Sequence, residues 1–297
     1  MQYERTPVSQ DQLKALASSF ALRGDFESGA PYGSGHINDT FAIRMDQAAL
    51  SHAMEGVDYV FHLAALISVP ESMEKPEECI ELNVNGLLHV LKAAESAGVK
   101  KLVLASSAAV YGDNPTVPKV ESMIPEPRSP YAITKLDGEY YCELWRREGR
   151  LETASLRFFN VFGPRQDPGS AYAAAAPVFI DKARKGEAIT IFGDGEQTRD
   201  FIYVKDIAAG LAYAAQTKLV QGAYNIGYGC SNSINNLART IVKMTGSKSE
   251  IKYAPTRPGD VKHSRASAGK LAATGWQPLY GFEQGLSETL SGISTLQ

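Results

Sequence analysis

The chain has 297 residues, of which 44% are hydrophobic and 21% charged, with a formal net charge of −3. This length and composition suit one large domain or two modest ones around a substantial core. The charge gives no basic footprint for nucleic acid, and the longest apolar runs, such as 173–180, are too short to span a bilayer. No apolar signal core follows Met1. We therefore expect a cytoplasmic protein with neither nucleic acid nor a membrane as partner.

The middle of the chain alternates predicted strands with predicted helix. Short β-branched and aromatic runs at 58–62, 101–105 and 153–159 are typical of buried parallel strands. Between the first two runs, residues 77–97 repeat apolar side chains at helical spacing and stop before Gly98, a candidate C-terminal cap. This order predicts an α/β fold with a doubly wound parallel sheet, which binds its ligands at the carboxyl ends of the strands.

Beyond Gly163 the pattern loosens into turns rich in proline and glycine. We predict a helix near 177–185, strands around Ile189 and Ala223, and a helix over 233–245. These elements indicate a smaller C-terminal lobe that binds substrate.

Three cysteines are too few and too widely spaced for a disulfide framework or a zinc site. They are Cys79, Cys142 and Cys230, each with apolar neighbours. This favours reduced, buried thiols, and we expect no metal centre.

A Tyr-x-x-x-Lys spacing provides the strongest chemical signal. Tyr131 and Lys135 lie on a predicted helix that Ser129 can cap and Pro130 can begin. Residues four apart share a helix face, and an ammonium beside a phenol lowers the phenol's pKa, so that Tyr131 can act as a base at neutral pH. Ser107, at the end of the second predicted strand, would share the substrate's hydrogen bond. The spacing alone also fits a surface tyrosine beside a solvated lysine.

Five motifs stand in the order found in extended short-chain dehydrogenases. They are Val60-Phe-His-Leu-Ala-Ala, Asn83-Val-Asn-Gly, Ala105-Ser-Ser-Ala-Ala-Val-Tyr-Gly, Ser129-Pro-Tyr-Ala-Ile-Thr-Lys and Arg157-Phe-Phe-Asn-Val-Phe-Gly-Pro-Arg. From about Ile43 onward the chain resembles the NAD-dependent nucleotide-sugar epimerases, which have a Rossmann-like fold, and it is most similar to UDP-hexose 4-epimerases. In that family a tyrosine takes a proton from a sugar hydroxyl while hydride passes to nicotinamide, and the keto intermediate then receives the hydride on its other face.

The resemblance implies catalytic and cofactor roles for the matching residues. Tyr131 would be the base, Lys135 its pKa partner and a ribose ligand, and Ser107 the hydroxyl clamp. The residues that would line the NAD cofactor are Leu63, Ala64, Ala65, Asn83 and, near the nicotinamide, Phe158. The two alanines can also be small only because a helix packs there, and the asparagine can merely bond neighbouring backbone.

The resemblance also implies a site for UDP or a UDP-sugar. The phosphate contacts would be Asn160, Arg199 and Arg257, since a guanidinium fork suits phosphate geometry. The uridine contacts would be Thr190, Ile191, Phe192 and Asp260. Solvated surface charges are the alternative for both arginines. Ser264 stands where relatives restricted to glucose and galactose often carry tyrosine, so this small residue leaves room for an N-acetyl group.

The beginning of the chain departs from the family. Relatives open with a strand, a glycine-rich turn, a helix and a second strand ending in an acid, which together hold the pyrophosphate and the adenosine ribose. No Gly-x-Gly-x-x-Gly or Gly-x-x-Gly-x-x-Gly occurs in this chain. Ala42-Ile43-Arg44 stands where the family has an acidic residue and a hydrophobic one before the next helix, so an acidic contact with adenine is also missing. We therefore expect NAD binding to be weak or absent and catalysis to be impaired. Two alternatives stay open: an active NAD-dependent UDP-hexose or N-acetylhexosamine 4-epimerase, and a non-catalytic nucleotide-sugar-binding or assembly protein.

Residues from about 20 to 45 resemble instead the glycine-rich hairpin of N-acetylhexosamine 1-kinases, on the motif Pro31-Tyr-Gly-Ser-Gly-His-Ile-Asn-Asp-Thr-Phe. So short a segment cannot supply the lysine and acids of a kinase. We expect 1–45 to be a non-family β-hairpin against the edge or face of an incomplete Rossmann-like sheet, 46–163 the truncated core, and 164–297 mainly the substrate lobe. An incomplete sheet leaves apolar surface, so we also expect a homo-oligomer, formed through the helices at 77–97 and 131–147.

Overall fold

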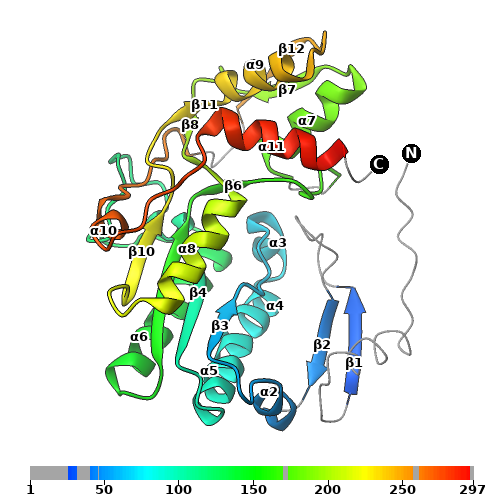
Figure 1. The fold of residues 1–297 in the computed structure, drawn as a ribbon. Coiled ribbons are helices and arrows are strands. Elements are labelled where there is room, and N and C mark those ends of the chain that lie inside the picture. Colours follow the sequence, from blue (N-terminus) through cyan, green and yellow to red (C-terminus); the bar gives the residue numbers. More distant parts are fainter. Residues whose placement is uncertain (1–25, 32–40, 46, 170–172, 257–260, 295–297) are drawn as a thin grey trace.

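The structure is a computed structural model that describes residues 26–31, 41–45, 47–169, 173–256 and 261–294. Its central feature is a parallel sheet of four strands in the order β10-β5-β4-β3 (Figure 1). The strands are β3 (Tyr59–His62), β4 (Lys101–Ser107), β5 (Glu152–Phe158) and β10 (Gly222–Ile226). The α/β fold and the strands predicted from the sequence are thus confirmed.

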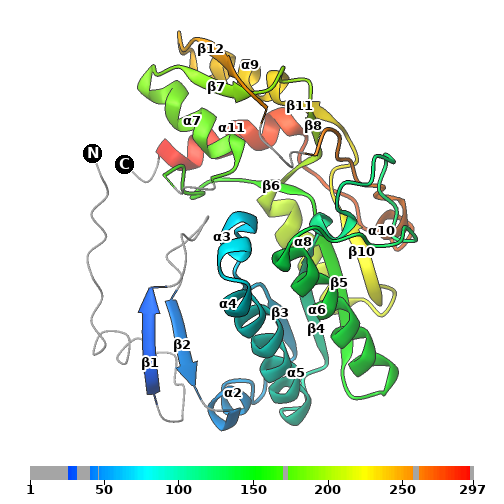
Figure 2. The ribbon, with the colours of Figure 1, turned by 180° about the vertical axis from the view of Figure 1, so that it is seen from behind.

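Helices cover both faces of the sheet (Figures 1 and 2). Leu102 and Leu104 of β4 pack in one apolar cluster with α5 (Gly86–Ser96) and α6 (Pro130–Arg147). Val103, which points to the opposite face, packs in another cluster with α8 (Val204–Gln216). Successive side chains of a strand alternate between its faces, so a fully buried β4 requires a helix layer on each side.

The local helix signals act as the sequence predicts. The side chain of Ser129 accepts a hydrogen bond from the backbone N–H of Ala132 (3.2 Å), and Pro130 occupies the first turn of α6. The helix expected over 77–97 is three consecutive pieces, α4 (Pro76–Ile80), a π-helical turn (Glu81–Asn85) and α5. It ends before Gly98, whose φ of 71° suits glycine. Among the described residues, α2 (Gln47–Ala53) and α3 (Val69–Glu74) precede it.

The C-terminal part adds short paired strands and helices above the sheet (Figure 1). Its elements are β6 (Asn160–Phe162), α7 (Ala175–Lys185), β7 (Ile189–Phe192), β8 (Thr198–Arg199), β9 (Phe201–Tyr203), β11 (Asn232–Ser233), α9 (Ile234–Thr245), β12 (Ile251–Ala254), α10 (Gly269–Ala272) and α11 (Phe282–Ser294). Phe162, Phe179, Leu237 and Leu286 share its core. Because α8 and β10 return to the main sheet, the two parts interleave along the chain.

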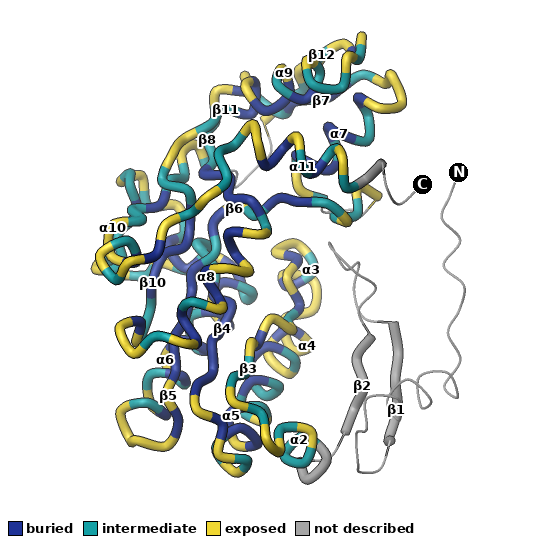
Figure 3. Tube along the Cα trace, viewed as in Figure 1, coloured by how far each residue is buried: buried dark blue, intermediate teal, exposed yellow. Residues whose placement is uncertain are grey.

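The main sheet and the N-terminal strands are separate. β1 (Phe26–Pro31) and β2 (Phe41–Met45) form an antiparallel pair, and among the described strands they pair only with each other. Within the same described set, β3 pairs only with β4, so the hairpin does not extend the sheet by hydrogen bonding. Much of α3 is exposed (Figure 3). The large apolar side chains that are exposed on β3, on the loop after it and on α3 are those of Phe61, Leu63, Ile67, Val69 and Met73.

The cysteine prediction holds for two positions of three. Cys79 and Cys142 are buried free thiols, and burial raises the pKa of Cys142 to about 12. Cys230 is exposed, because it lies in the turn between β10 and β11, so the expectation of a buried thiol is wrong there. In the part of the chain that the structure describes, no helix is both long and apolar enough to cross a membrane.

Candidate active site and nucleotide-sugar site

The predicted catalytic trio assembles where β4 meets α6. Ser107 is the last residue of β4, and its side chain accepts a hydrogen bond from the backbone N–H of Ala109 (3.1 Å). Lys135 is buried, with its Nζ 2.8 Å from the carbonyl oxygen of Ala105 and 5.8 Å from the ring centroid of Tyr131. A strand end and one helix face therefore bring Ser107, Tyr131 and Lys135 together.

Burial dominates the electrostatics of this trio. It raises the pKa of Tyr131, and a hydrogen bond with the Ser107 side chain offsets only part of that rise. It also lowers the pKa of Lys135 to about 8. The expectation that Lys135 brings the pKa of Tyr131 below its ordinary value is therefore wrong for this arrangement, because desolvation acts on both groups.

His62, at the end of β3, is a further buried titratable group beside the trio. Burial, with a smaller contribution from the charge of Lys135, lowers the pKa of this imidazole to about 4. The side chain is therefore neutral at physiological pH and adds no second positive charge near Lys135.

The buried side-chain amide of Asn83 connects the loop after β3 to α6. Asn83 Oδ1 accepts from the backbone N–H of Leu66 (2.7 Å), and its Nδ2 donates to the carbonyl of Leu66 (3.0 Å) and to Thr134 Oγ1 (2.9 Å). The π-helical turn contains Asn83, and such turns are frequent at functional sites. The contacts match the neighbouring-backbone alternative for this residue, and its cofactor contact stays a prediction.

The other predicted cofactor residues lie at the carboxyl end of the sheet. Leu63 and Ala64 are exposed and Ala65 is half-buried in the loop that follows β3. Phe158, also half-buried, is the register partner of Ser107 across β4 and β5. The register therefore places Phe158 beside Ser107, and its nicotinamide contact stays a prediction.

Backbone hydrogen bonds of the C-terminal lobe join two predicted sugar-phosphate residues, Asn160 and Ser264, to the chain neighbours of the third, Arg199. The N–H of Asn160 donates to the carbonyl of Asp200 (3.0 Å), directly after Arg199 in the chain. The N–H of Ser264 donates to the carbonyl of Thr198 (3.1 Å), directly before Arg199. Asn160 is exposed, and Arg199 and Ser264 are half-buried. Arg257 and Asp260 lie outside the described residues.

The predicted uracil border is only partly supported by the geometry. Along β7 the side chains alternate, and Thr190 and Phe192 are half-buried. Ile191 is 1% exposed and packs in the core of the lobe. Strand alternation therefore directs its side chain away from the surface that Thr190 and Phe192 share, and the uracil contact of Ile191 stays a prediction.

The sequence analysis missed Asp200, whose carboxylate joins three segments of the lobe. It is fully buried and accepts from the backbone N–H groups of Tyr228 (2.8 Å), Gly229 (3.0 Å) and Ala266 (2.9 Å). Burial raises the pKa of this carboxyl even though these amide bonds lower it. In the sequence, the feature that could have indicated Asp200 is its position directly after Arg199.

The described residues fit one half of a dinucleotide better than the other. Ser107, Tyr131, Lys135 and Phe158 form a compact polar and aromatic set that suits a nicotinamide riboside. For the adenylate half, a further parallel strand with a glycine-rich turn would have to flank β3, and the described strands include none there.

Comparison with known proteins agrees with this geometry. Residues 28–227 match the NAD dependent epimerase/dehydratase family, a span that begins upstream of Ile43 and includes most of the hairpin. A UDP-glucose 4-epimerase from Mycolicibacterium smegmatis is 35% identical over 78% of this chain and 75% of its own length.

Solved structures give the same result. A UDP-N-acetylglucosamine 4-epimerase from Methanobrevibacter ruminantium, in complex with UDP-N-acetylmuramic acid, is 41% identical with a TM-score of 0.81, covering 84% of this chain and 80% of that one. A UDP-glucose 4-epimerase from Thermus thermophilus, in complex with NAD, is 34% identical with a TM-score of 0.76, covering 84% of this chain and 82% of that one.

Proposed function

This chain belongs to the NAD dependent epimerase/dehydratase family, and within it we propose a UDP-hexose 4-epimerase-like protein of nucleotide-sugar metabolism. One observation carries the proposal. The trio of Ser107, Tyr131 and Lys135 lies at the same end of the sheet from which β5 leads, through Phe158, directly to Asn160, whose N–H donates to the carbonyl of Asp200, the residue after Arg199. Relatives described as acting on or binding UDP-sugars support the same substrate class.

In this proposal each member of the trio has a separate task. Tyr131 removes the proton from the sugar hydroxyl, and Ser107 holds the same hydroxyl oxygen and stabilises the phenolate by its hydrogen bond. Lys135, whose Nζ lies 5.8 Å from the centre of the Tyr131 ring, would hold the ribose of the cofactor. NAD, when bound, supplies the hydride acceptor and donor.

We infer that NAD binds weakly, and the protein as purified should carry no stoichiometric cofactor. Loss of two charge-assisted hydrogen bonds to a pyrophosphate weakens binding by about 3 to 6 kcal/mol, roughly 100- to 20,000-fold. Absorbance of the purified protein followed by calorimetric titration with NAD measures this. Titration of the same sample with UDP is the control for binding-competent protein. Tightly retained NAD would favour the alternative, an active 4-epimerase.

UDP alone should raise the melting temperature, whether or not NAD binds. A ligand that binds only the folded state at 100 times its Kd stabilises it by about 2.7 kcal/mol. Arg199→Met should weaken UDP binding about 10- to 100-fold, because a charge-assisted bond to phosphate is lost. Differential scanning fluorimetry over a UDP series measures both effects.

The matched control for Arg199 is Arg239→Met, an exposed arginine on α9. It should leave the UDP-dependent shift unchanged, and an equal loss in the two variants would argue against a phosphate contact at Arg199. In the same assay UDP-N-acetylgalactosamine should shift the melting temperature at least as far as UDP-galactose, since Ser264 is small. A clear preference for UDP-galactose would contradict that substrate proposal.

We also infer a homo-oligomer. On α6 the large side chains of Ile133, Tyr140 and Leu144 are exposed at helical spacing, and Ile80 of α4 is exposed as well. These helices are the ones that the sequence predicts for subunit contact. Exposed apolar side chains that gather on one face favour burial against a partner.

A further inference from the structure

A buried carboxylate lies on the catalytic helix below the trio. Tyr131, Lys135 and Glu139 are spaced four residues apart on α6, so they follow one another along one face of the helix. The side chain of Glu139 is 6% exposed. Its Oε1 accepts from Ser106 Oγ (2.5 Å) and Arg157 Nε (2.9 Å), and its Oε2 accepts from Arg157 Nη2 (2.7 Å).

The partners of Glu139 are the residues that immediately precede the site on two strands. Ser106 on β4 and Arg157 on β5 are register partners, and the next pair in register is Ser107 with Phe158. Ser106 and Arg157 point toward α6, as do Leu102 and Leu104 further back along the same face of β4. One carboxylate thus connects α6 to both strands at the last position before they reach the active site.

Arg157 extends this hydrogen-bond network to the turn that follows Ser107. Arg157 Nη1 donates to the hydroxyl of Tyr111 (2.8 Å), and that hydroxyl donates to Asn225 Oδ1 on β10 (2.6 Å). Tyr111 is the last residue of the 3-10 turn that Ser107 caps. The buried set therefore reaches three strands, α6 and the turn that orients Ser107.

Close packing leaves α6 little freedom to move against β4. A methyl group on Gly138, next to Glu139, would lie 3.0 Å from Leu104 and 3.1 Å from Leu87. Buried ion pairs add little net stability compared with well-packed apolar residues, but they can fix one arrangement of elements. The pair of Glu139 and Arg157 is placed to do this for the helix that carries the proposed base.

We propose that Glu139 is a positioning residue, which sets the height and rotation of α6 over β4 and β5 and thereby holds Tyr131 opposite Ser107. The inference rests on the proposed function for the role of Tyr131 as base. It assigns to Glu139 no contact with substrate or cofactor.

The test replaces the pair by apolar residues of similar length, Glu139→Met with Arg157→Met. Such exchanges often preserve folding, and this one removes one charge of each sign, so a changed titration of Tyr131 reports position rather than net charge. With tyrosine isotope-labelled at Cζ, and the Tyr131 signal assigned from Tyr131→Phe, the titration midpoint should move to higher pH because the Ser107 bond weakens. With saturating NAD, kcat should fall about 100-fold while the Kd for UDP stays unchanged.

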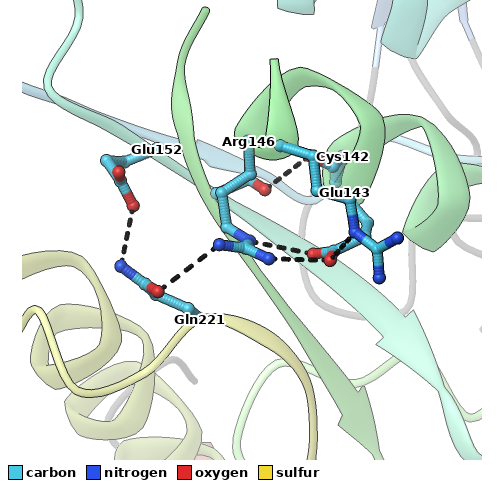
Figure 4. A network of polar contacts seen from close by, with 7 residues as sticks. Cys142, Glu143, Arg146, Glu152 and Gln221 are labelled. Carbon is cyan, nitrogen blue, oxygen red and sulfur yellow. Dashed lines mark hydrogen bonds and ion pairs between the residues drawn. The ribbon is translucent and has the colours of Figure 1, made fainter. Parts of the chain in front are cut away.

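The matched control is another ion pair on the same helix. Glu143 and Arg146 pair at 2.7 Å near the C-terminal end of α6, where Arg146 also reaches Gln221 (Figure 4). Glu143→Gln with Arg146→Gln should leave the Tyr131 midpoint and kcat as in the wild type. If this control moved the Tyr131 midpoint as far as Glu139→Met with Arg157→Met does, the proposal would be overturned. Loss of any ion pair on α6 would then be enough to change the titration of Tyr131.

A second variant, Glu139→Asp, tests the proposal if the double methionine variant does not fold. Glu139→Asp keeps the charge but shortens the side chain, so it should move the Tyr131 midpoint in the same direction by less. If a folded Glu139 variant of either kind titrates at the wild-type midpoint, the proposal is wrong. Absence of UDP binding by the wild type would instead count against the proposed function, and the Tyr131 titration would still decide the positioning role.

Discussion

Tyr131→Phe should reduce UDP-hexose interconversion, measured with added NAD, by at least about 100-fold, because a positioned general base contributes that much or more. The ring that packs at the start of α6 is retained and only the hydroxyl is removed. Binding of UDP should therefore stay at the wild-type Kd, since Thr190, Phe192 and Arg199, which are predicted to contact UDP, lie in the C-terminal lobe. A coupled-enzyme assay measures kcat and calorimetry measures the Kd for UDP, so the two effects are separated.

Tyr140→Phe is the matched control for this experiment. Tyr140 lies on the same helix but is 60% exposed and away from the trio. Its variant should retain wild-type turnover and wild-type UDP affinity. If Tyr131→Phe turned over substrate as fast as Tyr140→Phe, the assignment of Tyr131 as the base would be excluded.

Sequence analysis succeeds where the determinants of structure are local. Ser129 and Pro130 begin α6, and Gly98 ends the preceding helix, because caps and turn residues act on their immediate neighbours. The buried strands are visible as β-branched runs since both faces of a parallel sheet are covered. The trio is recognisable for the same reason, as a strand end and a helical spacing.

The missed features depend on contacts between distant parts of the chain. Glu139 meets Ser106, 33 residues away, and Asp200 meets Ala266, 66 residues away. No local pattern distinguishes such a carboxylate from a solvated one. The prediction of a lowered pKa for Tyr131 fails for a related reason. The shift depends on burial, which only the packed structure determines.

The start of the chain shows how motif reasoning and overall similarity differ. The absence of a glycine-rich turn is a statement about a few backbone positions, whereas the family match from residue 28 integrates weak similarity over many. The two are compatible, since a segment can resemble the family on average without the amides that bind a pyrophosphate. Affinity for NAD depends on those amides, which is why its measurement separates the proposed functions.

Asp200→Asn should lower the free energy of unfolding by about 1.5 to 3 kcal/mol and weaken UDP binding about tenfold. The new side-chain NH2 would face backbone N–H donors, so at least one of the amides of Tyr228, Gly229 and Ala266 loses its acceptor. The bond from Ala266 ties the segment containing Ser264 to the residue after Arg199, so its loss should disturb the proposed sugar-phosphate site. Denaturant unfolding and UDP calorimetry measure the two effects.

A second buried aspartate makes the result interpretable. Asp206 is 1% exposed and accepts from the backbone N–H groups of Leu279 (2.8 Å) and Tyr280 (3.1 Å), contacts that involve none of the predicted UDP residues. Asp206→Asn should therefore lose comparable stability yet bind UDP as tightly as the wild type. Equal weakening of UDP binding in both variants would mean that Asp200 only stabilises the lobe, since loss of any buried acceptor would then produce the same change.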